Sequence, residues 1–498
     1  MARIQVLVVT LFFLLGSCYS ASGQTNRVLE DFPFSTPEKQ GINSGTLDSM
    51  LRFIRETNQN IHHLTIIRNE HTIVDADIYP YSSHYLHDIA SVTKSITALL
   101  IGIGIDKQFI RNEDEPVLKF FPEIKSSDSV LNSLKIKHLV TMTSGFACGS
   151  TDGEKALSDM RNSKDWVRFI FDLPIVAAPG KSFSYCSCNF YLLAEIIYRA
   201  THLTPHDFAR KYLFALLKIQ KSEWLSNYKN INHGWGDLFL FPEDMAKLGI
   251  LVLQKGKWQD KQIISQHWVN KCLTTVSMLN EEKGYGYGWW TYDNGGFYEA
   301  AGRGRQTISI IPARNMVVTM LGGEFDAGAI GKYIFQSIQS DKALPENITA
   351  LAKLKANIKQ VGLKPVVQEK MLINDTVYNT LNHRTIVFEK NITEIDSLQL
   401  KFHSTTGGMV IFYKGKRQER YPFALSRRKY EIAIDSTLHL PAALQGGFTD
   451  SGKFILHYNQ LCRVNNFYFS FFVTGDRITT TVEETTNFIK INLASSLR

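Results

Sequence analysis

A serine and a lysine three residues apart stand at the start of an apolar segment, and such a pair can perform acyl transfer. Ser91 is followed by Val92, Thr93 and Lys94, and then by a run that is apolar on nearly every face up to Ile105. The run predicts a buried helix with Ser91 in its first turn, where backbone N–H groups and the helix dipole stabilise developing negative charge. Lys94 then lies one turn away on the same face, and its removal from water favours the neutral amine, which can accept the serine proton.

The Ser-x-x-Lys pattern alone is weak, because an N-cap serine followed by a solvated lysine has the same spacing. The pattern occurs three times: Ser226 with Lys229 lies among polar residues, and Ser426 with Lys429 lies in a highly charged turn. Only Ser91 introduces an apolar helix, so we assign the chemistry to that copy.

A tyrosine that precedes a second apolar helix can serve the same site. Tyr185 lies after a Pro-Gly turn and before a helix predicted over Phe190–Ile197. A phenol close to a lysine ammonium is favoured as the phenolate and becomes a competent general base near neutral pH. We therefore expect Tyr185 to join Ser91 and Lys94 as the third catalytic residue. Its alternative role is that of an aromatic plug in the core.

A glycine-rich strand entry is the third element of the predicted site. The segments from Tyr298 to Pro312 and from Met316 to Gly323 are predicted to form a hairpin of two strands. Glycines at the mouth of the first strand let a substrate approach the backbone, whose N–H groups can complete an oxyanion hole. A simple hairpin turn would also use glycine. The residues of this strand entry, assigned to the substrate and oxyanion region, are Gly302, Arg303, Gly304, Arg305 and Gln306.

Other catalytic and cofactor motifs are missing from the sequence. It contains no Gly-x-Ser-x-Gly elbow, no His-Glu-x-x-His motif, no P-loop and no well-placed Gly-x-Gly-x-x-Gly. We therefore expect no cofactor and no metal. The formal charge of +8 is spread along the chain without a block of five like charges, so a nucleic-acid partner is not expected either. The expected partner is a small-molecule ester or amide, and the oligomeric state is not predicted.

Length and patterning predict two domains of different class. The chain has 498 residues, of which 44% are hydrophobic and 20% charged, which is ample for packed cores. Residues 24–340 alternate helical and strand patterns, 341–364 contain a predicted linker helix, and 365–498 are a succession of strands and turns. We expect an α/β (α+β) domain followed by an accessory all-β barrel or sandwich, in which no chemistry is evident.

The first 23 residues have the pattern of a signal peptide. Arg3 precedes the apolar run Ile4–Gly16, and small residues lead to a cleavage point after Gly23. The run is too short to span a bilayer comfortably. We expect an exported protein, periplasmic or secreted. Alternatively, a bacterial lipobox ends at Cys18, whose lipidation would tether the protein to a membrane.

The remaining cysteines predict no disulfide framework. Five follow Cys18, an odd number in a large chain. Cys186 and Cys188 lack the spacing of a zinc ribbon or a redox pair and would lie side by side on one face of a strand. We therefore interpret the cysteines as structural.

Ser91-x-x-Lys94, Tyr185 and the glycine-rich strand entry together resemble the serine β-lactamase and penicillin-binding-protein superfamily, in its class C β-lactamase-like branch. The resemblance covers about residues 30 to 340 and is closest to the subgroup of the 6-aminohexanoate-dimer hydrolases. It implies a five-stranded-type antiparallel sheet flanked by helices, with an all-helical region. Further strings that resemble this branch are His87–Ala90, Leu139–Gly145, Gly234–Leu238 and Gly284–Trp290.

The resemblance also implies the roles of the site residues. Ser91 is the acylated nucleophile, Lys94 is its proton acceptor and charge partner, and Tyr185 is the base that shuttles protons. The backbone N–H of Ser91 and a second one near Arg305 or Gln306 hold the oxyanion.

Two departures from the family pattern bear on the substrate, and the resemblance places Ser187 in the same substrate and oxyanion region. Ser187 stands where these enzymes usually have Asn, and Gly302-Arg303-Gly304 stands where they have Lys-Thr-Gly. Arg303 or Arg305 could supply the missing positive charge. We expect an esterase, amidase or peptidase with weak or no β-lactamase activity. The alternative is a catalytically silent or acyl-trapping binding or sensor protein on the same fold.

Overall fold

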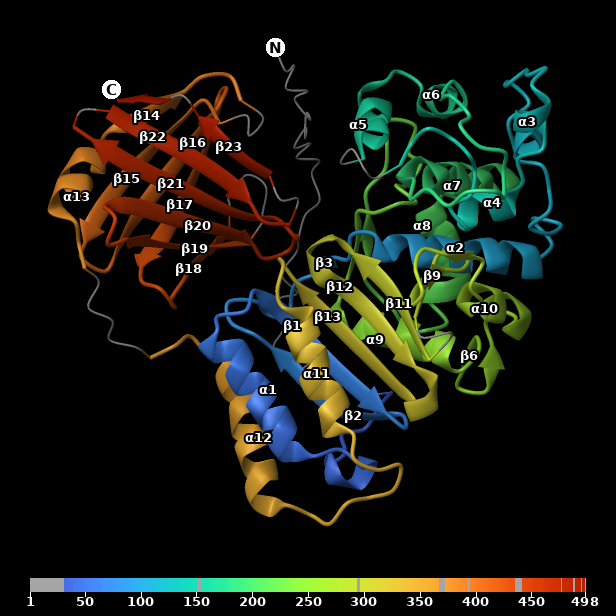
Figure 1. Cartoon of the computed structure of the whole chain (residues 1–498), viewed down its shortest axis with the longest axis horizontal. Coiled ribbons are helices and arrows are strands. Elements are labelled where there is room, and N and C mark those ends of the chain that lie inside the picture. Colours follow the sequence, from blue (N-terminus) through green and yellow to red (C-terminus); the bar gives the residue numbers. More distant parts are fainter. Residues whose placement is uncertain are drawn as a thin grey trace.

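The computed structural model describes residues 31–149, 154–292, 296–366, 372–391, 395–434, 441–475, 477–486, 489–493 and 495–497. The predicted signal peptide, with Cys18, lies outside these residues. Within the described part, no helix is long and apolar enough to cross a membrane. The chain folds into a sheet-and-helix domain and a domain made of strands, which lie side by side (Figure 1).

An antiparallel sheet of eight strands forms the centre of the first domain (Figure 1). Its order is β2-β1-β13-β12-β11-β10-β9-β8, so the N-terminal hairpin pairs with strands from the far end of the domain. The antiparallel sheet flanked by helices is thus confirmed, and three short strands extend the expected five. The strands are β1 (Ile61–Arg68), β2 (His71–Asp77), β8 (Ser277–Met278), β9 (Lys283–Tyr285), β10 (Trp290–Tyr292), β11 (Phe297–Gly302), β12 (Gln306–Ile311) and β13 (Met316–Gly322).

The segment predicted as one strand from Tyr298 to Pro312 is in fact two, so the expected two-stranded hairpin is a meander of β11, β12 and β13. The chain reverses in a 3-10 turn at Arg303–Arg305. Gly304 and Arg305 both adopt the left-handed conformation there, with φ of 74° and 70°. This turn ends β11 at Gly302 and pairs that residue with Gln306, the first residue of β12.

One face of the sheet is covered by α1 (Ser44–Glu56), α11 (Ala327–Ser337) and α12 (Ile348–Val361). The buried side chains of α1 recur every three or four residues, as expected for a helix with one apolar face. The helix predicted as a linker is α12. Its Leu354 and Val361 share one hydrophobic core with α1 and β1, and Arg55 on α1 donates to Gln360 on α12 at 2.6 Å.

The other face carries the buried helix α2 (Val92–Asp106) and the predicted helical region. Every residue of α2 from Val92 to Gly104 is buried, because helices or strands contact it on all sides. The remaining helices are α3 (Ser129–Asn132), α4 (Ile136–Val140), α5 (Lys155–Asn162), α6 (Trp166–Phe171), α7 (Ser187–Thr201), α8 (Pro205–Ala209), α9 (Pro242–Leu253) and α10 (Gln266–Leu273). Short strands in this region are β3 (His87–Asp88), β4 (Glu223–Trp224), β5 (Leu238–Leu240), β6 (Lys257–Trp258) and β7 (Lys261–Gln262).

The second domain is a nearly closed barrel, one of the two expected forms. Its sheet runs in the order β23-β22-β21-β20-β19-β17-β16-β15-β14-β24, with β18 paired to β19. Ser495 on β24 donates to the carbonyl of Ile478 on β22 at 2.7 Å, which brings the two ends of the sheet together. The elements are α13 (Asp375–Leu381), β14 (Thr385–Phe388), β15 (Ser397–Ser404), β16 (Gly407–Lys414), β17 (Arg417–Leu425), β18 (Glu431–Ile434), β19 (Pro441–Phe448), β20 (Lys453–Gln460), β21 (Asn466–Thr474), β22 (Arg477–Glu484), β23 (Ile489–Leu493) and β24 (Ser495–Leu497).

The close packing of α2 leads to a stability prediction. A Cβ on Gly102 would lie 2.1 Å from Trp268, whose indole is buried and donates to the carbonyl of Ala98. We expect Gly102→Ala to lower the free energy of unfolding by about 1–3 kcal/mol, because the indole must shift. Urea unfolding followed by fluorescence measures this change.

The matched control is Gly331→Ala on α11, where an added Cβ meets nothing within 4 Å. Alanine has the higher helix propensity, so we expect this variant to gain about 0.5–1 kcal/mol. Equal effects at the two glycines would contradict the packing around α2.

Candidate functional site

A strained turn presents Ser91 at the N-terminus of α2. Ala90 has φ 47°, a left-handed conformation that costs about 1–2 kcal/mol for a residue with a Cβ. The Asp88 carboxylate accepts a hydrogen bond from the Ala90 N–H at 2.8 Å. Asp88 is the last residue of β3, which pairs with β5. These contacts fix the backbone immediately before Ser91, which is partly exposed and stands at the N-cap of the helix.

Lys94 lies in the first turn of α2 with its side chain buried. The residue is 2% exposed, and its Nζ donates to Ser91 Oγ at 2.9 Å and to the carbonyl of Trp235 at 2.9 Å. A buried amino group is tolerated only when its N–H donors are satisfied, and these two oxygens satisfy two of them. The spacing predicted from the sequence therefore brings the lysine amine into direct contact with the serine hydroxyl.

Tyr185 precedes α7 by two residues and completes the predicted group. Lys94 Nζ lies 5.0 Å from the centroid of the Tyr185 ring. The ring stacks on Trp290 of β10, with the centroids 5.8 Å apart and the planes 9° from parallel. The structure thus brings Ser91, Lys94 and Tyr185 together, and the indole fixes the orientation of the phenol.

Gly302 is the third-motif residue that lies against the nucleophile. A Cβ on Gly302 would lie 2.9 Å from the N atom of Ser91 and 2.8 Å from the carbonyl oxygen of Ile89. Only glycine permits this approach, which sets the end of β11 beside the Ser91 N–H. The second oxyanion donor was predicted near Arg305 or Gln306, but Gly302, three residues before Arg305, makes this approach.

The other third-motif side chains are engaged elsewhere. Arg303 donates to Thr486 in the barrel, and Arg305 forms an ion pair with Glu324 at 2.9 Å. The side chain of Gln306 is fully buried and bridges the turn, since it donates to the carbonyl of Arg303 and accepts from the N–H of Gly322. Gly304 lies at the barrel contact rather than at Ser91, as its added Cβ would lie 3.1 Å from Val464.

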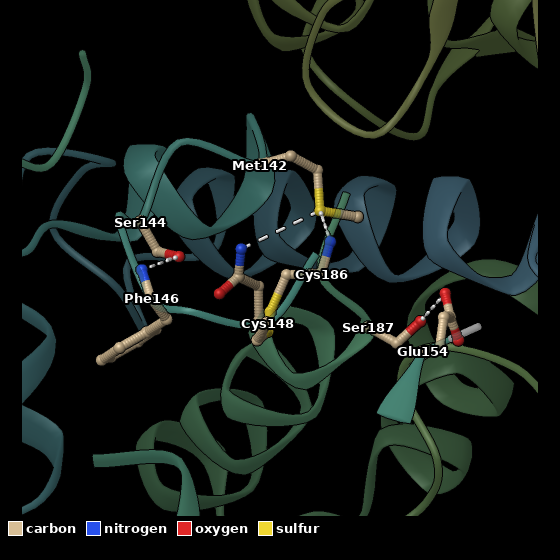
Figure 2. The surroundings of a disulfide bond; sticks show 8 residues. Met142, Ser144, Phe146, Cys148, Glu154, Cys186 and Ser187 are labelled. Atoms are coloured by element: carbon tan, nitrogen blue, oxygen red, sulfur yellow. Dashed lines mark hydrogen bonds between the residues drawn. A yellow bond between two sulfur atoms is a disulfide. The ribbon is translucent and has the colours of Figure 1, made fainter. Parts of the chain in front are cut away.

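Ser187 also has a partner that its sequence position did not indicate. Its hydroxyl donates to Glu154 at 2.9 Å, and the residue is buried at the start of α7 (Figure 2). Glu154 lies 33 positions earlier, so no local pattern could identify it. Trp235 and Trp290 lie in two strings that resemble the family, Gly234–Leu238 and Gly284–Trp290. The sequence did not indicate that the Trp235 carbonyl accepts from Lys94 or that Trp290 stacks on Tyr185.

The cysteine prediction was wrong in two respects. Cys148 and Cys186 form a disulfide with their Cα atoms 5.3 Å apart, and Cys186 is the N-cap of α7 rather than a strand residue (Figure 2). The bond joins two segments 38 positions apart, a pairing that spacing alone does not reveal. Cys188 remains a free thiol, and its burial raises its pKa to about 12.

Metal ligands gather at one place in the described part of the chain, where the sulfur atoms of Cys148, Cys186 and Cys188 lie within 4.8 Å of one another. Two of the three are joined in the disulfide. This donor set therefore has one thiol left and does not fit a metal ion in the oxidised protein.

The Asp88 carboxylate stands out electrostatically. Burial raises its pKa to about 6, and the negative charge of Asp237 acts in the same direction. The Ala90 N–H and the positive charges of Arg463 and Arg303 oppose this rise. For Asp237, burial is outweighed by the hydrogen bond and charge of His233, and the pKa is lowered.

Comparison with known proteins supplies an independent finding. The family model described as Beta-lactamase matches residues 63–324. The chain is 25% identical over 259 residues to the 6-aminohexanoate-dimer hydrolase of Paenarthrobacter ureafaciens. The match covers 47% of this chain and 65% of that protein. The chain thus spans slightly less than two thirds of the length of this curated relative.

Two solved structures are similar to this chain to different degrees. EstCE1, a hydrolase with promiscuous acyltransferase activity, has a TM-score of 0.50 and 12% identity, covering 60% of this chain and 99% of that chain. The octameric penicillin-binding protein homologue from Pyrococcus abyssi has a TM-score of 0.46 and 17% identity, covering 91% of this chain and 99% of that chain. At such identities the likeness to EstCE1 shows the fold alone.

The disulfide beside Tyr185 yields a stability prediction. Its sequence separation of 38 gives an unfolded-state loop entropy worth about 4 kcal/mol. We expect Cys148→Ala to lower the free energy of unfolding by about 2–4 kcal/mol, as measured by urea unfolding under oxidising conditions.

Dithiothreitol provides the control for this variant. It should bring the wild-type protein down to the stability of Cys148→Ala and leave the variant itself unchanged. A wild-type protein that is insensitive to complete reduction would contradict a stabilising bond.

Proposed function

Because the chain belongs to the beta-lactamase family, we propose that it is an exported serine hydrolase that acts through an acyl-Ser91 intermediate on a small ester or amide. The observation that carries this proposal is the contact of 2.9 Å between Lys94 Nζ and Ser91 Oγ, with the centroid of the Tyr185 ring 5.0 Å from the same amine. A serine hydroxyl in contact with a buried amine, with a phenol ring beside that amine, is an arrangement suited to activating the nucleophile.

In the acylation step, Ser91 Oγ attacks the carbonyl carbon of the substrate and its proton passes to the pair of Lys94 and Tyr185. The bond from Oγ to the acyl carbon forms, the bond to the leaving group breaks, and the leaving group takes up that proton. The negative charge on the carbonyl oxygen develops at the N-terminus of α2, where the Ser91 N–H and the adjacent end of β11 stabilise it.

In the deacylation step, a water molecule attacks the same carbonyl carbon. The Lys94–Tyr185 pair accepts a proton from the water and returns one to Ser91 Oγ as the ester bond breaks. One site therefore serves both halves of the reaction. The carbonyl of Trp235 holds Lys94 in place throughout, since it accepts from the amine but does not take part in the proton transfer.

The charges around the site favour a neutral acyl group over a β-lactam. A β-lactam presents a carboxylate, and the sequence offered only Arg303 and Arg305 to bind it. Arg303 is bonded to Thr486 and Arg305 is paired with Glu324. A substrate carboxylate would have to displace these partners, so we propose weak or no β-lactamase activity. The name of the Paenarthrobacter ureafaciens relative, a hydrolase of an amide dimer, agrees with a small amide as one substrate class.

A second candidate function is an acyl-trapping binding or sensor protein on this fold. The hydrogen bond of Ser187 to Glu154 favours it, because Ser187 stands where the family usually has Asn and its hydroxyl is already engaged by Glu154. Such a protein would react once at Ser91 and release the acyl group very slowly.

The proposal predicts the activity of three variants. We expect Ser91→Ala, Lys94→Ala and Tyr185→Phe each to lower the turnover of short-chain p-nitrophenyl esters by about 1,000-fold or more. The wild type should cleave these esters but cleave a chromogenic cephalosporin poorly.

A fluorophosphonate that reacts with activated serines separates the alternatives. Labelling of Ser91 without ester turnover would favour the acyl-trapping protein. If the wild type neither turns over esters nor becomes labelled at Ser91, the hydrolase proposal is wrong.

The approach of Gly302 to Ser91 gives a further prediction. The Cβ of Gly302→Ala would occupy the space beside the Ser91 N–H where the oxyanion forms. We expect kcat for p-nitrophenyl esters to fall by about 100-fold, the effect of losing one oxyanion donor. Gly331→Ala, on a helix of the opposite face, is the matched control and should keep wild-type kcat. An unchanged kcat in Gly302→Ala would place the oxyanion elsewhere.

A further inference from the structure

The barrel touches the turn that leads into the nucleophile. The segment between β20 and β21 lies against this turn, and the N–H of Asp88 donates to the carbonyl of Cys462 at 3.0 Å. Two residues on, Val464 contacts Gly304 in the third motif. The segment from Cys462 to Val464 therefore bridges the first and third motifs of the proposed site, although it belongs to the other domain.

Arg463 stands in the middle of this segment and points toward the same turn. Its guanidinium carbon lies 5.8 Å from the ring of Phe239, and Phe239 is the residue of β5 that pairs with Asp88. Its Nε is buried with no hydrogen-bond partner among the described residues. The positive charge acts on the carboxylates of both Asp88 and Asp237.

We propose that Arg463 is a positioning residue for the nucleophile: its positive charge, beside the strand pair of Phe239 and Asp88, strengthens the hydrogen bond by which the Asp88 carboxylate holds the left-handed turn at Ala90 that presents Ser91. This inference rests on the proposed role of Ser91 and gives the barrel a part in the reaction. The physical basis is that a hydrogen bond from an N–H to a carboxylate is about twice as strong as one to a neutral acceptor.

The groups facing Asp88 leave its ionisation finely balanced. Asp237 carries a like charge nearby, although His233 is bonded to it at 2.7 Å. Arg463 and Arg303 supply the opposing charge. Arg303, which belongs to the first domain, donates a hydrogen bond to Thr486 of the barrel. A nitrogen of its guanidinium lies 4.0 Å from a carboxylate oxygen of Glu484.

Of the remaining titratable neighbours, one is neutral above its lowered pKa and another acts on Asp237 rather than on Asp88 directly. His87 bonds to the Asp88 carbonyl at 2.7 Å, and burial lowers its pKa to about 4. Arg161 acts on Asp237. Removal of the Arg463 charge therefore shifts the balance at Asp88 toward the protonated form.

The pH dependence follows from this balance. Burial, with Asp237, raises the pKa of Asp88 to about 6, so the carboxylate is ionised above that pH and becomes protonated as the pH falls through it. Protonation weakens the bond to the Ala90 N–H, and the reactivity of Ser91 should fall. Loss of the Arg463 charge raises the Asp88 pKa further, so the same fall should occur at a higher pH.

The test measures the rate of fluorophosphonate labelling of Ser91 in the full chain between pH 5 and pH 9. Labelling reports on the nucleophile directly and requires no knowledge of the substrate. We expect the acid limb of the wild type near pH 6, and that of Arg463→Gln higher by about one pH unit. Arg463→Lys restores the charge and should move the limb back toward the wild type.

Two further variants make the readout specific. Arg477→Gln removes an exposed arginine from β22 of the same barrel and should keep the wild-type limb. Asp88→Asn cannot ionise and should label slowly with no acid limb near pH 6. If Arg463→Gln does not fold, Arg463→Met, which keeps an unbranched apolar stem beside Phe239, takes its place.

The outcomes separate this inference from the function on which it rests. A folded Arg463→Gln protein whose labelling is uniformly slower, with the wild-type acid limb, would show a purely structural role and overturn the inference. An acid limb that persists in Asp88→Asn would do the same. A wild-type protein that is not labelled at Ser91 at any pH would overturn the proposed function, and the inference with it.

Discussion

A buried lysine side chain sets the conditions that the rest of the first domain must meet. Lys94 is almost wholly removed from water, and a polar amino group in that position is destabilising unless its N–H groups find acceptors. Ser91 Oγ and the carbonyl of Trp235 are those acceptors. The loop that carries Trp235 must therefore pack against α2. The serine hydroxyl is held by the same bond that stabilises the lysine, so burial and activation share one interaction.

The apolar surroundings of α2 and the strained backbone before it together determine how Ser91 is presented. A helix buried on every face cannot present a side chain to substrate except at its end, and Ser91 is at that end. The chain enters the helix through Ala90 in a left-handed conformation, which Asp88 stabilises from the side. Gly302 then lies so close to Ser91 that no side chain fits between them. The left-handed turn at Ala90 places Ser91 at the helix N-terminus, and the missing Cβ of Gly302 leaves space beside it.

Much of this was predictable from the sequence, because the responsible patterns are local. Ser91 and Lys94 are one helical turn apart, and Tyr185 directly precedes an apolar helix, so their elements could be located without knowledge of the fold. Alternating apolar residues likewise predicted the strands of the second domain. Contacts between distant segments were not predictable: the disulfide partner of Cys186, the acceptor of the Ser187 hydroxyl and the break between β11 and β12 each depend on residues that meet only in the folded chain. The sequence therefore predicted the residues of the candidate site better than their environment.

The fate of the third-motif arginines shows how the environment changes the chemistry. From the sequence, Arg303 and Arg305 were free charges at the edge of the site, suited to a substrate carboxylate. In the folded chain, Arg303 donates a hydrogen bond to Thr486 of the barrel, and Arg305 forms an ion pair with Glu324. The positive potential that would attract an anion is reduced by two carboxylates, because Glu324 is paired with Arg305 and Glu484 lies 4.0 Å from Arg303. The barrel thus contacts the candidate site at two points, Arg303 in the third motif and Asp88 before Ser91. If the proposed function holds, a domain in which no chemistry is evident in the sequence influences both the choice of substrate and the reactivity of the serine, without contributing a reacting atom.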